Sequence, residues 1–206
     1  MRSLIGLAAL ALLPACMRGD MTLDFESPEV VVARSAIDLT LPMLDAFGMG
    51  ADGVCGAGKA TETAQGVTCR SVKRNDVAEV IAGRVDFGGF GGEMDLTGIV
   101  TTERIRSDRI RVSVDVAALV DAVRAVDPAG YGAFLHEAND GDVQGLILRV
   151  RGGEIVGTTG QLSEDGEEAR IFIRASVFQA PDPDISGYFI TLLKFPGDCL
   201  IDLFCD

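Results

Sequence analysis

The sequence predicts an α+β domain that is dominated by antiparallel β-sheet, contains one or two short helices and is braced by disulfide bonds. Three observations support this fold class. Several short segments alternate apolar and polar residues, which is the period of a strand with one solvent-exposed face. Turn-forming pairs such as Gly152–Gly153 and Asp165–Gly166 separate some of these segments. Four cysteines stand in the remainder of the chain after Cys16, and an even number of cysteines is typical of secreted, disulfide-bonded domains.

The first half of the chain predicts extended structure that is interrupted by a glycine-rich loop. Residues 29–41 carry apolar side chains at alternate positions and predict a strand. Residues 48–66 contain six glycines and few large apolar side chains, so we expect an irregular loop there. Residues 77–87 fit either a short helix or a strand, and the sequence leaves that choice open.

The middle of the chain predicts a hairpin followed by a helix. Residues 96–106 and 109–116 predict two strands that flank Ser107–Asp108. Asp115 is a residue type that caps helices well, and it precedes a segment, residues 116–126, in which valine and leucine recur on one side. We therefore expect a capped amphipathic helix in that segment.

The last third predicts more antiparallel sheet. Residues 145–151, 154–161 and 169–178 predict a three-stranded meander, because Gly152–Gly153 forms a two-residue turn of the kind that hairpins favour. Residues 188–195 predict a final strand.

The N-terminus has the features of an export signal. Residues 4–15 are an uncharged apolar run that follows a short basic start at Arg2. A membrane-spanning helix needs about 20 apolar residues, so this run is too short to cross a bilayer. A basic start, a short apolar core and a small residue at the end are typical of a secretory signal peptide. The sequence therefore predicts a signal peptide over residues 1–15.

Leu13–Pro14–Ala15–Cys16 ends this run and resembles the cleavage box of bacterial lipoprotein precursors. The resemblance implies that cleavage falls before Cys16 and that a diacylglycerol is attached to the Cys16 thiol. Leu13 and Ala15 occupy the apolar and small positions of the box, whereas Pro14 departs from the small or hydroxyl residue usual there. Ordinary signal-peptidase cleavage after Ala15, which leaves Cys16 without lipid, is the alternative.

The resemblance covers the leader alone, and it also implies a location. Two or three acyl chains hold a protein firmly on a membrane. Lipoproteins that stay in the inner membrane usually carry Asp after the lipidated cysteine, and Met17 stands there in this chain. We therefore expect attachment to the outer membrane rather than the inner, with the domain facing the periplasm. Residues 16–28 then form the lipidated N-terminus and a tether, and residues 29–206 form one β-rich domain.

The cysteines after Cys16 predict two local disulfides. Cys55, Cys69, Cys199 and Cys205 allow three connectivities, of which we favour Cys55–Cys69 with Cys199–Cys205. The first pair would close the glycine-rich loop. Zinc is the competing interpretation, but structural zinc sites bring cysteines in pairs separated by two to four residues. The pairs here are separated by more than that, and we expect no metal site.

Three further patterns suggest chemistry only weakly. Residues 53–60 nearly spell a phosphate-binding P-loop, but Ala60 stands where the motif needs a hydroxyl to hold Mg²⁺. His136 is the single histidine and could serve as a general base or a metal ligand. A surface histidine without a catalytic partner is the expected case. Asp140 and Asp142 carry the oxygen ligands that Ca²⁺ prefers, yet they lack the spacing of an EF-hand loop, and the sequence leaves calcium open there.

The composition narrows the function to a class. The chain has a formal charge of −13 and a pI near 4.4, which argues against nucleic acid and anionic lipid headgroups as electrostatic partners. The sequence contains no recognisable catalytic motif, so we expect a non-enzymatic protein without cofactor that binds or scaffolds an envelope protein. The alternatives are a periplasmic carrier of a small apolar or lipidic ligand and, less favoured, a carboxylate-based cell-wall hydrolase.

Overall fold

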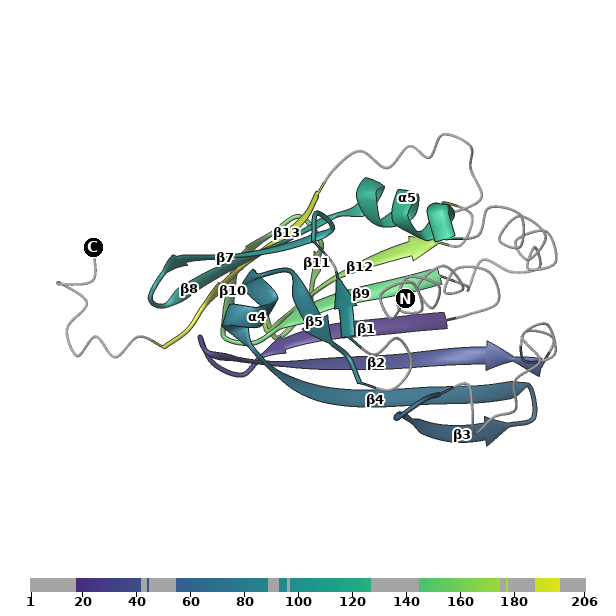
Figure 1. Ribbon diagram of the computed structural model, residues 1–206. Coiled ribbons are helices and arrows are strands. Elements are labelled where there is room, and N and C mark those ends of the chain that lie inside the picture. The colour runs from purple at the N-terminus through teal and green to yellow at the C-terminus, as the bar shows by residue number, and fades with distance from the viewer. Residues whose placement is uncertain are drawn as a thin grey trace.

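Two β-sheets face each other in the computed structural model of the chain (Figure 1). The structure describes residues 18–41, 44, 55–88, 93–95, 97–126, 145–174, 177 and 188–196. The elements are β1 (Arg18–Phe25), β2 (Val30–Thr40), β3 (Lys59–Thr63), β4 (Gly66–Asp76), α4 (Val77–Ile81), β5 (Arg84–Asp86), β6 (Glu93–Asp95), β7 (Val100–Arg106), β8 (Arg109–Asp115), α5 (Val116–Val126), β9 (Gly145–Arg151), β10 (Glu154–Thr158), β11 (Gln161–Leu162), β12 (Glu168–Arg174) and β13 (Tyr188–Lys194).

The larger sheet has seven strands in the order β11-β12-β9-β1-β2-β4-β3, and the smaller has four in the order β10-β13-β8-β7. Every pair of neighbours is antiparallel except β1 and β9, which run parallel. A separate two-stranded ribbon joins β5 to β6. The predicted fold class, mostly antiparallel sheet with short helices and a disulfide, is confirmed.

The core lies between the two sheets because each strand turns alternate side chains inward. In β8, Ile110, Val112 and Val114 are buried while the residues between them are half-buried or exposed. This is the period-2 pattern that predicted the strand. The inner faces of both sheets contribute to one apolar cluster, whose largest fully buried side chains include Phe25, Phe189, Ile110, Leu146 and Leu193.

The chain crosses from one sheet to the other at Gly152–Gly153, so the prediction of a meander there is wrong. β9 pairs with β1 and β12 in the larger sheet, whereas β10 pairs with β13 in the smaller one. Both glycines have positive φ, 111° and 56°. A Cβ atom at Gly152 would overlap the carbonyl oxygen of Phe25, and one at Gly153 would overlap that of Lys194. The two glycines therefore permit a tight corner between sheets rather than a hairpin.

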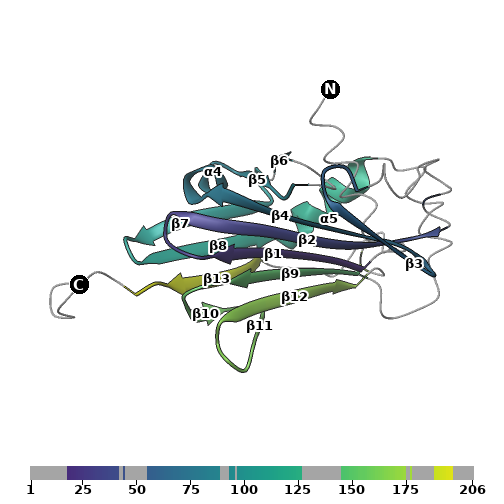
Figure 2. The same cartoon turned by 90° about the horizontal axis from the view of Figure 1, so that it is seen from below.

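The side of the molecule opposite this corner is filled by α4 and β5. Residues 77–87, which the sequence left open, contain both a helix and a strand. α4 contacts β4, β5 and β7, so it lies between β4 of the larger sheet and the edge strand β7 of the smaller one. Figure 2 shows α4 and β5 on the same side as β7 and β4, and away from β10 and β12. The buried side chains of α4 are Val77 and Val80.

Asp115 caps α5 as the sequence predicted, since its Oδ1 accepts a hydrogen bond from the backbone N–H of Ala118 at 2.9 Å. The buried face of the helix includes Val116, Leu119 and Val120. None of the described helices is long and apolar enough to cross a membrane.

Two segments differ from their prediction. Residues 18–25, expected as part of a tether, form β1 with paired strands on both sides. Met21, Leu23 and Phe25 turn into the core, which explains why this segment folds with the domain. Residues 59–63, expected as loop, form the outer strand β3. Its burial pattern is almost entirely exposed, so no apolar alternation marks it in the sequence.

Candidate functional site

The space between the sheets contains a small apolar cavity of about 40 Å³. Its lining comes from both sheets and from α5, and consists of Met21, Leu23, Phe87, Ile99, Val100, Val114, Leu119, Leu146, Leu148, Arg149, Val150 and Phe189. Sites for organic ligands usually enclose about 300–1,000 Å³. The cavity is therefore far smaller than an acyl chain or a drug-sized ligand requires, and the outer surfaces of the sheets are the better candidates.

The outer face of the larger sheet is rich in arginine. Outward-facing positions of β1, β2, β4, β9 and β12 carry Arg18, Arg34, Arg70, Arg74, Arg149, Arg151, Arg170 and Arg174, as the strand registers and burial patterns show. The carboxylates on the same strands and face are Asp20, Asp24, Asp38, Asp76 and Glu168. We call this surface the arginine-rich face.

At the centre of the arginine-rich face, Arg149 forms ion pairs with carboxylates on both neighbouring strands. Its guanidinium donates hydrogen bonds to Asp20 on β1, at 2.8–3.0 Å, and to Glu168 on β12, at 2.7 Å. All three side chains are largely buried, with exposed fractions of 18–27%. The hydrogen bond with Asp20, followed by the one with Glu168, raises the pKa of Arg149 above its already high ordinary value. The three groups thus form a charged bridge across three neighbouring strands.

The outer face of the smaller sheet is apolar at its centre. Tyr188, Ile190 and Leu192 alternate on β13 with the buried residues of that strand. Tyr188 is 60% exposed, and Val156, which lies in a bulge of the neighbouring β10, is 43% exposed. We call these four residues the apolar ridge. Charged side chains of both signs surround it on the same face, namely Glu103, Arg111, Asp115, Glu154 and Lys194.

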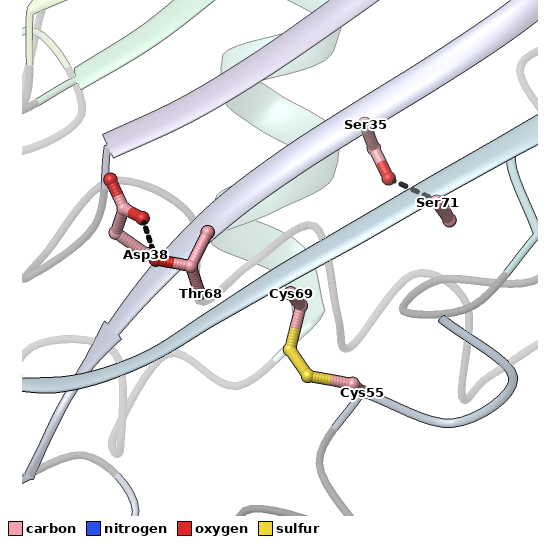
Figure 3. The surroundings of a disulfide bond; sticks show 6 residues. All are labelled: Ser35, Asp38, Cys55, Thr68, Cys69 and Ser71. Carbon is pink, nitrogen blue, oxygen red and sulfur yellow. Dashed lines mark hydrogen bonds between the residues drawn. A yellow bond between two sulfur atoms is a disulfide. The ribbon is translucent and has the colours of Figure 1, made fainter. Parts of the chain in front are cut away.

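The predicted Cys55–Cys69 disulfide is confirmed. It joins the turn before β3 to β4, with Cα atoms 5.2 Å apart, and both cysteines are buried (Figure 3). Two hydrogen bonds link β2 and β4 nearby: Ser35 Oγ to Ser71 Oγ, and Thr68 Oγ1 to Asp38 Oδ1, each at 2.7 Å. The disulfide therefore fixes the outer edge of the larger sheet.

Several predicted positions lie outside the described residues: Cys16, Cys199, Cys205, His136, Asp140 and Asp142. The P-loop resemblance can be judged, because Lys59 opens strand β3 whereas a P-loop lysine opens a helix. In the part of the chain that the structure describes, no cluster of three or more His, Cys, Asp or Glu side chains could hold a metal ion.

The sequence did not identify the arginine-rich face or the apolar ridge. A cationic strand face could have been predicted from alternating arginines in two segments. These are Arg149 and Arg151 on β9, and Arg170 and Arg174 on β12. The sequence does not tell that β9 and β12 are neighbours, nor that β1 lies beside β9.

Comparisons with known proteins identify no family for the chain. No family model matches the chain, and no curated protein matches it. One similar solved structure is the folded domain of LppM, a lipoprotein of Mycobacterium tuberculosis. It is 8% identical, with a TM-score of 0.49, and the alignment covers 90% of this chain and 93% of that chain.

Proposed function

We propose that the chain is an exported lipoprotein, anchored through Cys16, whose domain binds another protein of the cell envelope. The leader and the Leu13–Cys16 box support the anchor. The outer membrane is the proposed location, with the domain facing the periplasm, because Met17 rather than Asp follows Cys16. The proposal contains no catalytic step and no cofactor.

The observation that carries the binding proposal is the apolar ridge. Its residues lie together on one sheet face, and Tyr188 and Val156 are more than two-fifths exposed. A contiguous apolar surface that is rimmed by polar residues is typical of a protein–protein interface. The rim has both signs of charge, for example the Arg111–Glu103 ion pair at 3.2 Å. A rim of mixed sign favours a protein partner over a membrane or a polyanion, since these would be repelled by the acidic groups.

Site-specific photocrosslinking in cells tests this proposal. A photoreactive phenylalanine analogue in place of Tyr188 is expected to give a discrete crosslinked product with one envelope protein. The same analogue in place of Val72 is the matched control, because Val72 is 66% exposed but lies on the arginine-rich face. Leu192→Asp in the first variant should remove the product, because it adds a charge to the apolar ridge without altering the core. Equal products from both positions, or none from position 188, would contradict the proposal.

A carrier of a small apolar ligand is the second candidate, and the apolar lining of the cavity between the sheets is the observation behind it. The cavity of about 40 Å³ is too small for a lipid chain, since an apolar cavity of about 150 Å³ is needed to hold benzene. This function therefore requires the sheets to separate. Native mass spectrometry of the purified protein should detect no bound lipid if the first proposal is right, and a stoichiometric lipid if the second is right.

A further inference from the structure

One corner of the arginine-rich face gathers cations beside the start of β1. Arg18, Gly145 and Arg174 lie in one cross-strand row, because Gly145 is the register partner of both arginines. Arg170 and Phe172 lie on the same face of β12 as Arg174. We call Arg18, Arg170, Phe172 and Arg174 the basic corner.

The three arginines of the basic corner have no ionic partner within 4 Å in the described part of the chain. Asp20 and Glu168, which lie two residues from Arg18 and Arg170 on the same strands and face, are already bound by Arg149. The corner is therefore locally positive although the whole chain has a charge of −13. A negative net charge argues against an anionic lipid partner only if the charge is spread evenly over the surface. In this chain the charge is uneven, because the three arginines lie together.

Phe172 gives the basic corner an apolar centre. It is 43% exposed and stands between Arg170 and Arg174 on the strand. Its ring packs over Gly145, where a Cβ atom would lie 2.9 Å from the ring carbon Cε2. The absence of a side chain at Gly145 therefore lets the ring rest on the backbone of β9. An aromatic side chain with basic neighbours is the composition that protein surfaces use at a lipid interface.

The position of the lipid anchor indicates that the basic corner contacts the membrane rather than another protein. Cys16 precedes Arg18 by two residues, which span at most about 7 Å. This step rests on the proposed function, in which Cys16 carries the lipid. Arg18 then lies within about one Debye length, roughly 8 Å at physiological salt, of the lipidated residue, and Arg174 lies two strands, about 10 Å, from Arg18. No tether of the predicted length separates the corner from the anchor, because β1 begins at Arg18.

We propose that the basic corner binds the anionic phospholipid surface in which the Cys16 lipid is anchored. The arginines attract the phosphate groups, and the ring of Phe172 enters the headgroup region. The corner acts as a second membrane attachment beside the lipid. It holds the arginine-rich face toward the bilayer, so that the apolar ridge on the opposite sheet faces away from the membrane.

A single tryptophan can report this contact, because the chain contains none. The full lipidated chain carrying Phe172→Trp is reconstituted into vesicles with brominated acyl chains, made of phosphatidylcholine with or without phosphatidylglycerol. The fluorescence of the introduced indole should be quenched in the anionic vesicles and recover in about 1 M salt, where the Debye length falls to about 3 Å. Tyr188→Trp is the matched control on the opposite sheet and should not be quenched in either vesicle.

Removal of charge tests the role of the arginines. Each arginine near an anionic surface strengthens binding roughly fivefold, so adding Arg170→Gln/Arg174→Gln to the Phe172→Trp chain should weaken the vesicle contact by roughly tenfold or more. The variant Arg84→Gln/Arg106→Gln removes the same charge elsewhere on the surface, outside the rim of the apolar ridge, and should leave the quenching unchanged. Equal quenching in neutral and anionic vesicles, or an equal effect of the two double variants, would overturn the proposal.

The proposed function and the membrane contact fail in different ways. Cys16→Ala should move the protein from the membrane to the soluble fraction of cells, and no change would overturn the anchor. If Cys16→Ala does release the protein but the indole at position 172 is not quenched in any vesicle, the basic corner alone is overturned. Protection of that indole by an acidic polypeptide, with no quenching by vesicles, would also overturn it and make the corner a protein-binding site.

Discussion

The outer faces of the two sheets differ in chemistry although the same core supports both. On β9 the inward residues Leu146, Leu148 and Val150 alternate with the outward residues Ile147, Arg149 and Arg151. On β13 both faces are largely apolar, since Tyr188, Ile190 and Leu192 point outward. A strand that is apolar on both faces usually lies inside a protein. At the apolar outward face of β13, Tyr188 is exposed and Ile190 and Leu192 are half-buried, which indicates a surface that is covered in use. The outward face of β9 carries two arginines and one isoleucine and is more suited to water or headgroups.

The contrast shows that the net charge of a β-sandwich does not predict the charge of either of its outer faces. Strand periodicity sorts charges onto one side of each sheet, so a chain with a charge of −13 can present a cationic surface. On the arginine-rich face, eight arginines stand with five carboxylates on the outward positions of five strands. The acidic excess lies elsewhere in the sequence.

The largest expected effect on stability comes from removing a core side chain that packs between the two sheets. Phe189 is 2% exposed, lines the cavity and packs from the smaller sheet toward the larger. Phe189→Ala should lower the free energy of unfolding by about 3–5 kcal/mol. Urea denaturation measures this, and hydrogen exchange should show β9 and β13 losing protection together, because both sheets share one core.

Phe172→Ala is the matched control for this prediction. The Phe172 side chain is 43% exposed on the arginine-rich face, so its removal should cost about 1 kcal/mol or less. Similar losses for the two variants would mean that the outer face contributes to stability as the core does. This result would contradict the prediction that core residues, and not residues of the outer face, determine the stability of the domain.

Removal of the disulfide is expected to have the next largest effect on stability. It should loosen the larger sheet, which carries the arginine-rich face, and leave the smaller sheet unchanged. Cys55 and Cys69 are 14 residues apart in the sequence, and closing a loop of about 15 residues stabilises a domain by roughly 3 kcal/mol. Cys55→Ala/Cys69→Ala should lower the free energy of unfolding by about this amount. The first loss of hydrogen-exchange protection should occur in β3 and β4, at the edge of the arginine-rich face, while β13 keeps its protection.

Reduction of a chain that carries Cys199→Ala/Cys205→Ala is the control for the cysteine substitution, because it opens the Cys55–Cys69 bond without removing its two buried sulfur atoms and leaves no second predicted disulfide to reduce. It should give a similar loss of stability. Uniform loss of protection across β4 and β13 would show that the edge of the larger sheet does not open independently.

The sequence predicted the local structure well wherever one face of an element is buried. Alternation identified β8, and Asp115 identified the start of α5. The prediction failed where tertiary contacts decide the outcome. Gly152–Gly153 has the composition of a hairpin turn, but the close approach of the carbonyl groups of Phe25 and Lys194 makes it a corner between sheets. Residues 18–25, which fall in the tether predicted over residues 16–28, form a central strand. Met21, Leu23 and Phe25 alternate with polar residues, a strand signal that the prediction missed, whereas the parallel pairing with β9 is invisible in the sequence.

The candidate surfaces were harder to predict than the fold, because each of them combines strands that are distant in the sequence. The basic corner joins Arg18 to Arg170 and Arg174 through the neighbours of β9. The spacing of these arginines along the chain contains no sign of this contact. By contrast, the Cys55–Cys69 pair was predictable because it is local and encloses a loop without apolar periodicity.

The smallest expected effect is a local response to pH at the turn that leads into β12. The Ser163 hydroxyl donates a hydrogen bond to Asp165, and the backbone N–H of Glu167 donates another to the same carboxylate at 3.1 Å. These bonds favour the charged form and lower the pKa of Asp165 below its ordinary value. A lowered pKa stabilises the turn above the unfolded pKa, and this contribution is lost as the pH falls through the folded pKa.

Ser163→Ala removes the stronger of these bonds and should raise the pKa of Asp165 toward its ordinary value. The turn, which positions Glu168 for Arg149 through the Glu168 N–H bond to Ser163 Oγ at 3.0 Å, should then loosen at a higher pH than in the native chain. An NMR titration of the Asp165 carboxyl carbon and the Gly166 amide measures both changes. Ser163→Thr keeps the hydroxyl and should titrate as the native protein does, whereas an unchanged pKa in Ser163→Ala would contradict the prediction.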